Sequence, residues 1–136
     1  MEDILALHRY YIWANRLREH FDVAISRTPL GSNANSQTYF ADDVGLFMSH
    51  WYAALYVVVE GWKKLELSDP QLDQLLSAPH IELLKRYRNG VYHFQKNYFD
   101  PRFSELFEAK EAKSVAPWVR ELNLGFGRYF LERLSD

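Results

Sequence analysis

Apolar residues recur at steps of three and four along the beginning of the chain, which is the spacing of one face of an α-helix. They form a stripe of Leu7, Tyr10, Ala14, Leu17, Phe21 and Ala24. Polar side chains such as Arg9, Arg16 and Glu19 lie off this stripe. The pattern predicts a helix over residues 2–26, followed by a loop over residues 28–36, where small, polar and helix-breaking residues collect.

A second helix, predicted over residues 40–65, has apolar residues on nearly every face. One stripe consists of Phe47, Trp51, Leu55, Val58 and Trp62, and the other sides carry Tyr52, Ala54, Tyr56 and Val57. A helix of this kind lies at the centre of a fold, or between its own core and a partner. Asp42 and Asp43 suit its N-terminus, where carboxylates offset the positive end of the helix dipole.

Shorter helical patterns follow. Ser68-Asp69-Pro70 is a helix start signal, because Pro is tolerated at the first helical position, and it predicts a short helix ending at Leu76. Gly125 and Gly127 lie inside the last predicted helix, where they indicate a kink or the close approach of another helix. Further helices are expected over residues 81–97, 103–109 and 116–134, with a polar connector over residues 108–113.

These patterns together predict an all-α fold, because no segment shows the sustained period of two that is typical of β-strands. We expect one domain over residues 1–136, built as an antiparallel bundle of about four long helices plus one or two short helices.

Composition narrows the class of protein further. The chain has 136 residues, of which 48% are hydrophobic and 16% aromatic, and it contains no cysteine. Its N-terminal sequence lacks the layout of a secretory signal peptide, and its most apolar run, residues 51–59, is too short to cross a bilayer. We therefore expect a cytoplasmic protein with no membrane partner. The net charge of −2 excludes a protein that binds nucleic acid through overall basicity.

Candidate chemistry is concentrated in the segment Arg88-Asn89-Gly90-Val91-Tyr92-His93. An Arg can hold a phosphate through two parallel hydrogen bonds, and a His titrates near neutral pH and can transfer protons. Together these groups supply what cleavage of an RNA phosphodiester needs without a metal. The surrounding residues 80–102 carry five cations against two anions, so the segment is locally basic although the chain is not.

Helical geometry places these residues around the predicted helix. His93 projects roughly opposite the apolar face, which consists of Leu84, Tyr87, Val91 and Phe94. Arg86, Asn89 and Lys96 share the side of His93 and are candidate substrate-binding residues, whereas Arg88 lies on a flank. At Gly90 the absence of a side chain could admit a backbone, a phosphate or a second helix.

The spacing of Arg88, Asn89 and His93 resembles the Arg-x(4–6)-His signature of HEPN domains (higher eukaryotes and prokaryotes nucleotide-binding), in which a polar residue such as Asn often follows the Arg. The helix WYAALYVVVEGW before the segment RYRNGVYHFQ is also similar to a group of uncharacterised bacterial proteins. The HEPN resemblance implies a homodimer that acts as a metal-independent endoribonuclease without a cofactor, in some members as a toxin paired with a small antitoxin protein.

That resemblance also implies a role for each residue of the signature. His93 would be the acid–base group, and Arg88 would neutralise the charge that builds on the phosphate in the transition state. Asn89 would orient His93 or a phosphate oxygen. The ribose 2′-OH would be the nucleophile, leaving a cyclic phosphate on one product. In a symmetric dimer, Arg88 of one subunit could serve His93 of the other.

Glu60 is an acidic residue within an apolar helix, and a buried carboxylate must be paired or protonated. It could form an ordinary structural salt bridge, or it could pair with Arg88 or His93 and support the site from behind.

Histidines also raise the question of a metal. The segment Trp13-Ala14-Asn15 together with His50 resembles the three-histidine metal-binding bundles of the damage-inducible type. That family needs a His pair at i, i+4 late in the chain, which His80 and His93 do not provide, so we expect no metal. We expect His50 in the core or an interface, and the remaining two, His8 and His20, on the surface.

A second hypothesis is a non-enzymatic helical module, such as a catalytically inactive HEPN-like dimerisation domain or a module that binds nucleotides or RNA. The aromatic surplus and the apolar second helix both suit an interface.

Overall fold

The computed structural model describes residues 1–28, 42–108 and 112–135, and for Ala112 and Lys113 only the backbone. Within these residues the chain forms helices and no strand, which confirms the predicted all-α class. None of the described helices has the length and apolarity needed to cross a membrane. The helices are α1 (Glu2–Ser26), α3 (Asp43–Lys64), α4 (Pro70–Leu76), α5 (His80–Tyr92), α6 (Pro101–Glu108) and α7 (Ala112–Leu134).

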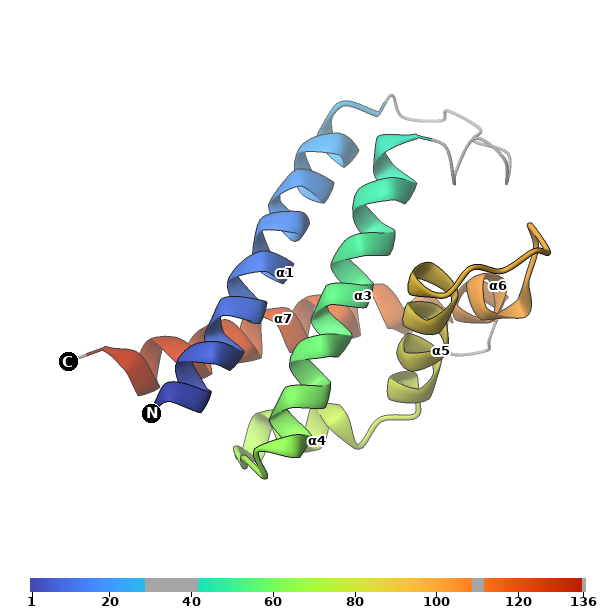
Figure 1. The fold of residues 1–136 in the computed structure, drawn as a ribbon. Coiled ribbons are helices and arrows are strands. Elements are labelled where there is room, and N and C mark those ends of the chain that lie inside the picture. The colour runs from blue at the N-terminus through green and yellow to red at the C-terminus, as the bar shows by residue number, and fades with distance from the viewer. Residues whose placement is uncertain (29–41, 109–111, 136) are drawn as a thin grey trace.

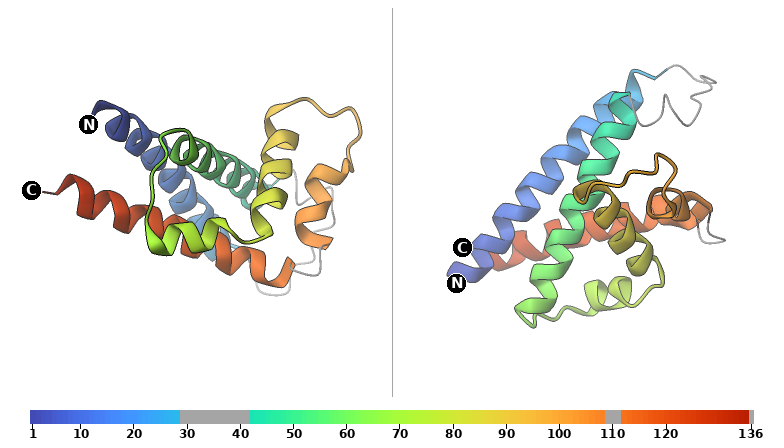
Figure 2. Two further views of the ribbon diagram at one scale, coloured as in Figure 1. Left: turned by 90° about the horizontal axis from the view of Figure 1, so that it is seen from below. Right: turned by 45° about the vertical axis from the view of Figure 1, so that its right-hand side comes forward.

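The first two helices, α1 and α3, run antiparallel and side by side, and α7 crosses both of them (Figure 1). On the far side of α3 from α1 lies α5, and α6 packs beside α5. The short α4 follows the C-terminal end of α3 and lies along α7 (Figure 2). The bundle is therefore organised around α3, which contacts α1 on one side and α5 on the other.

The apolar stripe predicted for the first helix is largely the buried face of α1, and the bounds of this helix are as predicted. Its buried residues are Ile4, Leu7, Ala14, Phe21 and Ala24. Tyr10, which belongs to the predicted stripe, is instead 39% exposed. The stripe faces α3, because a surface helix buries its apolar side against the core.

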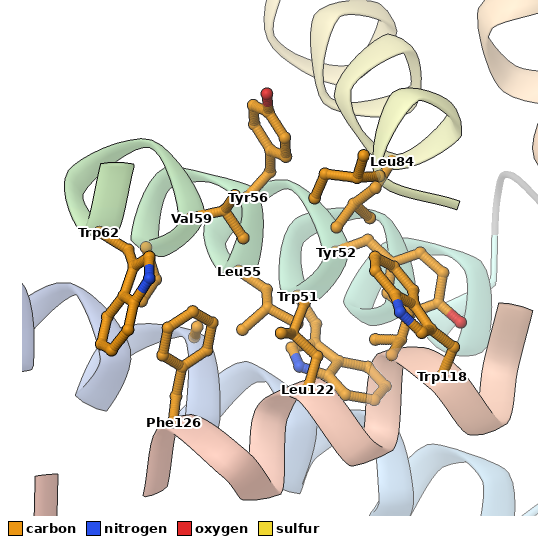
Figure 3. Packing of buried hydrophobic residues seen from close by; sticks show 14 of the residues in the cluster. Trp51, Tyr52, Leu55, Tyr56, Val59, Trp62, Leu84, Trp118, Leu122 and Phe126 are labelled. Atoms are coloured by element: carbon orange, nitrogen blue, oxygen red, sulfur yellow. The ribbon is translucent and has the colours of Figure 1, made fainter. Parts of the chain in front are cut away.

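The second helix, α3, lies at the centre of the fold, which is the first of the two positions that the sequence left open. Ten residues of α3 are buried, spread over several faces of the helix. Figure 3 shows Trp51 and Leu55 pointing from α3 toward Leu122 and Phe126 of α7, while Tyr56 points away from α7. Asp42 starts the helix, since its carboxylate accepts a hydrogen bond from the Gly45 amide at 3.0 Å. Residues 29–41, which contain most of the predicted loop and the predicted start of this helix, lie outside the described residues.

A polar contact joins the three longest helices inside this core. Asn123 of α7 is 1% exposed and accepts a hydrogen bond from the Trp51 indole of α3 at 3.0 Å. Its amide nitrogen donates to Asn15 of α1, also at 3.0 Å. Because both polar ends of the Asn123 amide are paired, the group is buried without an unmet hydrogen bond and fixes the relative position of α1, α3 and α7.

The two glycines of α7 mark close approaches of other helices, one of the two readings of the sequence. A Cβ at Gly127 would lie 2.5 Å from the Tyr11 hydroxyl of α1, and one at Gly125 would lie 2.9 Å from Leu72 of α4. Of the remaining boundaries, α4 ends at Leu76 as predicted. The last helix, α7, begins at Ala112 instead of residue 116, which places Pro117 inside the helix.

Candidate functional site

The candidate residues sit on and just after α5, which is attached firmly to α3. Leu84 and Tyr87 are fully buried on the face that packs against α3. The Tyr87 hydroxyl is hydrogen-bonded to the hydroxyl of Ser49 on α3 at 2.7 Å. The apolar face predicted for this segment is therefore correct at these two positions, and it sets which residues of α5 turn outward.

Arg88 is held in one position by three neighbours. Its two terminal nitrogens donate to both carboxylate oxygens of Glu60, with Nη2 to Oε2 at 3.3 Å, and its Nε donates to Asn89 Oδ1 at 3.0 Å. The guanidinium carbon also lies 5.0 Å from the centre of the Tyr56 ring, within the range of a cation–π contact. The Arg88 side chain is 17% exposed as a result, so the guanidinium is ordered and its charge is matched by a carboxylate.

Glu60 therefore pairs with Arg88, which is one of the pairings that the sequence left open. The carboxylate is 47% exposed, so this is a bidentate pair at the surface rather than a buried one. Tyr56 stands one helical turn before Glu60 on α3 and completes the cradle of Arg88. Burial raises the pKa of the Tyr56 hydroxyl, Glu60 raises it further, and Arg88 opposes the change.

His93 lies outside the helix, where the sequence placed it inside. The predicted helix over residues 81–97 ends at Tyr92, and His93 has extended backbone angles of φ −121° and ψ 123°. Its amide still donates to the Asn89 carbonyl at 3.1 Å, and its own carbonyl accepts from Gln95 Nε2 at 2.8 Å. The imidazole is exposed to solvent. The early end of the helix also corrects the expectation for Phe94, which is 93% exposed instead of packed in the core.

The chain leaves α5 early because a tight turn and the start of α6 follow at once. The Phe99 amide donates to Asn97 Oδ1 at 3.1 Å, and the Asp100 amide donates to the Asn97 carbonyl at 3.1 Å. Asp100 then accepts from the Arg102 amide at 2.9 Å, and Pro101 is the first residue of α6. Asp100-Pro101 thus starts α6 directly after this turn.

Gly90 admits a second helix and not a phosphate. A Cβ at this position would lie 3.1 Å from Arg102 Cβ and 3.1 Å from the Phe103 ring, which belong to α6. The absence of a side chain at Gly90 therefore serves the packing of α6 against α5. The sequence left three neighbours open at Gly90, namely a backbone, a phosphate or a second helix, and the structure shows the second helix.

The two further cations named from the sequence differ in their surroundings. Arg86 forms an ion pair with Glu105 of α6, in which Nη2 and Oε1 are 3.1 Å apart, and the hydrogen bonds that Arg86 donates to Glu105 raise the pKa of the guanidinium. Lys96 is exposed on the connector between α5 and α6 and forms no ion pair with any described carboxylate. Arg86 is thus occupied within the fold, whereas the Lys96 ammonium is open to an external anion.

Two neighbours of the site, the aromatic Tyr56 and the imidazole of His50, were not indicated by the sequence. Tyr56 was read only as part of an apolar face, although its position four residues before Glu60 puts both on one side of α3. His50 of α3 lies beside Tyr92, with ring centres 6.0 Å apart, and is therefore a half-buried neighbour of the last turn of α5. Burial raises the pKa of the Tyr92 hydroxyl, and Arg88 acts in the opposite direction.

Other histidines are placed elsewhere in the fold. His20 is exposed on α1, as expected, with its ring stacked on Phe47, and His8 is half-buried against Phe130. His80 is 9% exposed and its Nε2 is 2.8 Å from the Ser114 hydroxyl. Within the described ranges, no three His, Asp or Glu side chains come together in a way that could hold a metal ion.

No family model, curated protein or solved structure matches this chain. The HEPN resemblance accordingly rests on Arg88, Asn89 and His93 and on the helical architecture around them. The structure brings Arg88 and Asn89 into direct contact and leaves His93 exposed beyond the end of the same helix.

Proposed function

We propose that this chain is a metal-independent endoribonuclease of HEPN type, in which His93 transfers protons and Arg88 contacts the scissile phosphate. The observation that supports this most directly is the exposed imidazole of His93, one residue beyond α5, following an Arg88–Asn89 pair whose geometry is fixed. Exposure gives RNA access to the imidazole, and the fixed guanidinium supplies a donor set that needs no rearrangement.

The reaction would proceed by internal attack. The ribose 2′-oxygen attacks the adjacent phosphorus while a histidine accepts its proton, and the bond from phosphorus to the 5′-oxygen breaks as that oxygen gains a proton. The products are a 2′,3′-cyclic phosphate and a 5′-hydroxyl. In a homodimer two copies of His93 would be available, so one could act as base and the other as acid.

Arg88 can contribute to this site despite its partner. A guanidinium has five N–H donors, and three of those of Arg88 are used by Glu60 and Asn89. The remaining two, one on each terminal nitrogen, can donate to phosphate oxygens, and Glu60 and Tyr56 hold the guanidinium plane that sets their directions. Glu60 is thus a positioning residue in this proposal, and Asn89 holds the third guanidinium nitrogen, Nε. Arg86 and Lys96 are the cations that would bind the substrate further from the scissile phosphate.

The same ion pair favours an alternative: a catalytically inactive HEPN-like module for dimerisation or for binding nucleotides or RNA. Glu60 matches the charge of Arg88, which lowers the attraction of the guanidinium for a phosphate. In that case Arg88 joins α5 to α3 and has no further task. A toxin role with an antitoxin partner, or a location in the cytoplasm, is compatible with either function.

RNA cleavage by purified protein in excess chelator tests the proposal. Wild type should leave cyclic phosphate ends, and His93→Ala should lower the rate by about 100-fold or more, the usual range for loss of an acid–base group. His20→Ala is the matched control, because His20 is also an exposed histidine but lies on α1, and its rate should equal that of wild type. No cleavage, or equal cleavage by His93→Ala, would favour the inactive module.

A further inference from the structure

The segment around His93 exposes an unusual number of aromatic side chains. On the connector between α5 and α6, residues 93–100, Phe94 is 93% exposed, Phe99 is 56% exposed and Tyr98 is 50% exposed. Tyr92, the last residue of α5, is 49% exposed. A folded chain gains free energy by burying such rings, so a group of exposed aromatic residues in one short segment indicates a surface that another molecule covers.

The residues between these rings indicate what kind of molecule that is. Gln95, Lys96 and Asn97 separate Phe94 from Tyr98, so the exposed rings alternate with amides and one ammonium group. The exposed aliphatic side chains Leu124 and Leu131, each 71% exposed, lie on α7 instead. Rings interleaved with polar and cationic groups are typical of surfaces that stack nucleic-acid bases, since every base presents a flat π-face beside a charged backbone.

The connector is held in place by its own hydrogen bonds. Gln95 donates to the His93 carbonyl at 2.8 Å and accepts from the Arg102 guanidinium of α6 at 3.2 Å. The rings of Tyr98 and Phe99 meet edge to face, with centres 5.0 Å apart. A ligand would therefore meet rings whose backbone is already ordered, which lowers the entropy that binding must overcome.

We propose that the connector is a base-stacking site, in which Phe94, with Tyr98 and Phe99, holds unpaired bases of a single-stranded RNA. This inference rests on the proposed function and adds to it the part of the substrate that is recognised. Phe94 is the chain neighbour of His93, with Cα atoms about 3.8 Å apart. A base stacked on Phe94 leaves the phosphate beside it within reach of the His93 imidazole. Duplex RNA, whose bases are already stacked and paired, does not bind at this site.

Charge at the connector predicts a shallow dependence on salt. Lys96 forms no ion pair with the described carboxylates, whereas Arg102 is paired with Asp100. Lys96 and Arg88 of the proposed site are then the two cations expected to contact phosphates, so the logarithm of affinity should fall against the logarithm of salt with a slope of about 1 to 1.5. Binding carried by stacking persists at salt concentrations that abolish binding carried by phosphate contacts alone.

The test measures binding apart from cleavage. Fluorescence anisotropy gives the affinity of full-length protein for a labelled 2′-O-methyl single-stranded oligonucleotide, which lacks the nucleophile and is not cleaved. Phe94→Ala and Phe94→Leu should each lower the affinity at least about fivefold, and Phe94→Trp should keep it, because stacking needs a ring. Leu124→Ala is the control, since it removes another strongly exposed apolar side chain, 71% exposed on α7, and should leave the affinity unchanged.

Each other outcome overturns the inference in a distinguishable way. If wild type binds the oligonucleotide and Phe94→Ala binds equally well, the stacking site is wrong while the proposed function stands. The same holds if Phe94→Leu binds like wild type, because the contact is then merely apolar. If wild type binds no single strand, the stacking site is wrong. The proposed function then fails too, unless the protein still cleaves RNA in excess chelator. If Phe94→Ala instead separates a dimer in sedimentation without changing RNA affinity, the rings are covered by a second copy.

Discussion

Arg88→Ala removes three interactions of one guanidinium, and their sum predicts its cost. Glu60 is 47% exposed, so the ion pair contributes about 0.5–1 kcal/mol. The contact with Tyr56 contributes about 1 kcal/mol, between the values for exposed and desolvated pairs, because the Arg88 side chain is only 17% exposed. The hydrogen bond to Asn89 adds about 0.5 kcal/mol. We expect a loss of about 2 kcal/mol in the free energy of unfolding.

Urea unfolding followed by tryptophan fluorescence measures this loss, because Trp51 and Trp62 are almost fully buried and report on the core. Arg88→Lys keeps the charge but not the bidentate and stacked geometry, and should cost about 1 kcal/mol. The control is Arg16→Ala on the exposed side of α1, which forms no ion pair in the described part of the chain and should change stability by less than about 0.5 kcal/mol.

A cost for Arg88→Ala as small as that of the control would refute this reasoning. The guanidinium would then not rest on Glu60 and Tyr56 in solution, and it would be free to meet a phosphate with its full charge. Because the variant is less stable, its cleavage rate must be measured at a temperature where it is as fully folded as wild type. Only then does a lower rate in Arg88→Ala indicate a catalytic role of Arg88.

Two further predictions concern the scaffold. Asn123→Leu should lower the free energy of unfolding by about 2 kcal/mol, measured in the same urea experiment, because it leaves the buried Trp51 indole N–H without an acceptor; a change below about 0.5 kcal/mol would contradict the buried network. The second concerns Asp22, whose pKa lies below its usual 3.8 chiefly through the hydrogen bond from Arg120. Its stabilising effect is complete above pH 3.8 and is lost as pH falls through the lower, folded-state pKa. Unfolding of Asp22→Asn measured from pH 7 down to pH 2 should therefore show a smaller loss than wild type, and an identical pH profile would contradict the assignment.

Sequence patterns predicted the long helices well, because each has many buried positions. The stripe of α1 spans several turns, so its bounds follow from the pattern, and one wrong member, Tyr10, does not change them. The central position of α3 was one of the two positions indicated by apolar residues on nearly every face of this helix. For elements of this length local spacing and tertiary packing agree, which is why the fold class could be predicted.

The end of α5 could not be predicted from the same rule. Phe94 continues the three-and-four spacing of Leu84, Tyr87 and Val91, yet the helix ends at Tyr92 and Phe94 is exposed. The turn at Asn97 and the packing of α6 on Gly90 decide that end, and both depend on residues distant from the periodic pattern. The pairing of Arg88 with Glu60 could be given only as one of several alternatives, because the spacing of residues within α5 does not show which face of α3 lies opposite.

The position of His93 one residue past α5 bears on how such a chain can change under selection. Adding a residue before Tyr92 would turn everything behind it by about 100° around the helix axis and disturb the buried face. Adding one after Tyr92 would lengthen the extended segment by about 3.3 Å, and Arg88 would keep its contacts with Glu60 and Tyr56. The separation between guanidinium and imidazole can therefore be lengthened in small steps while the buried face of α5 stays in place.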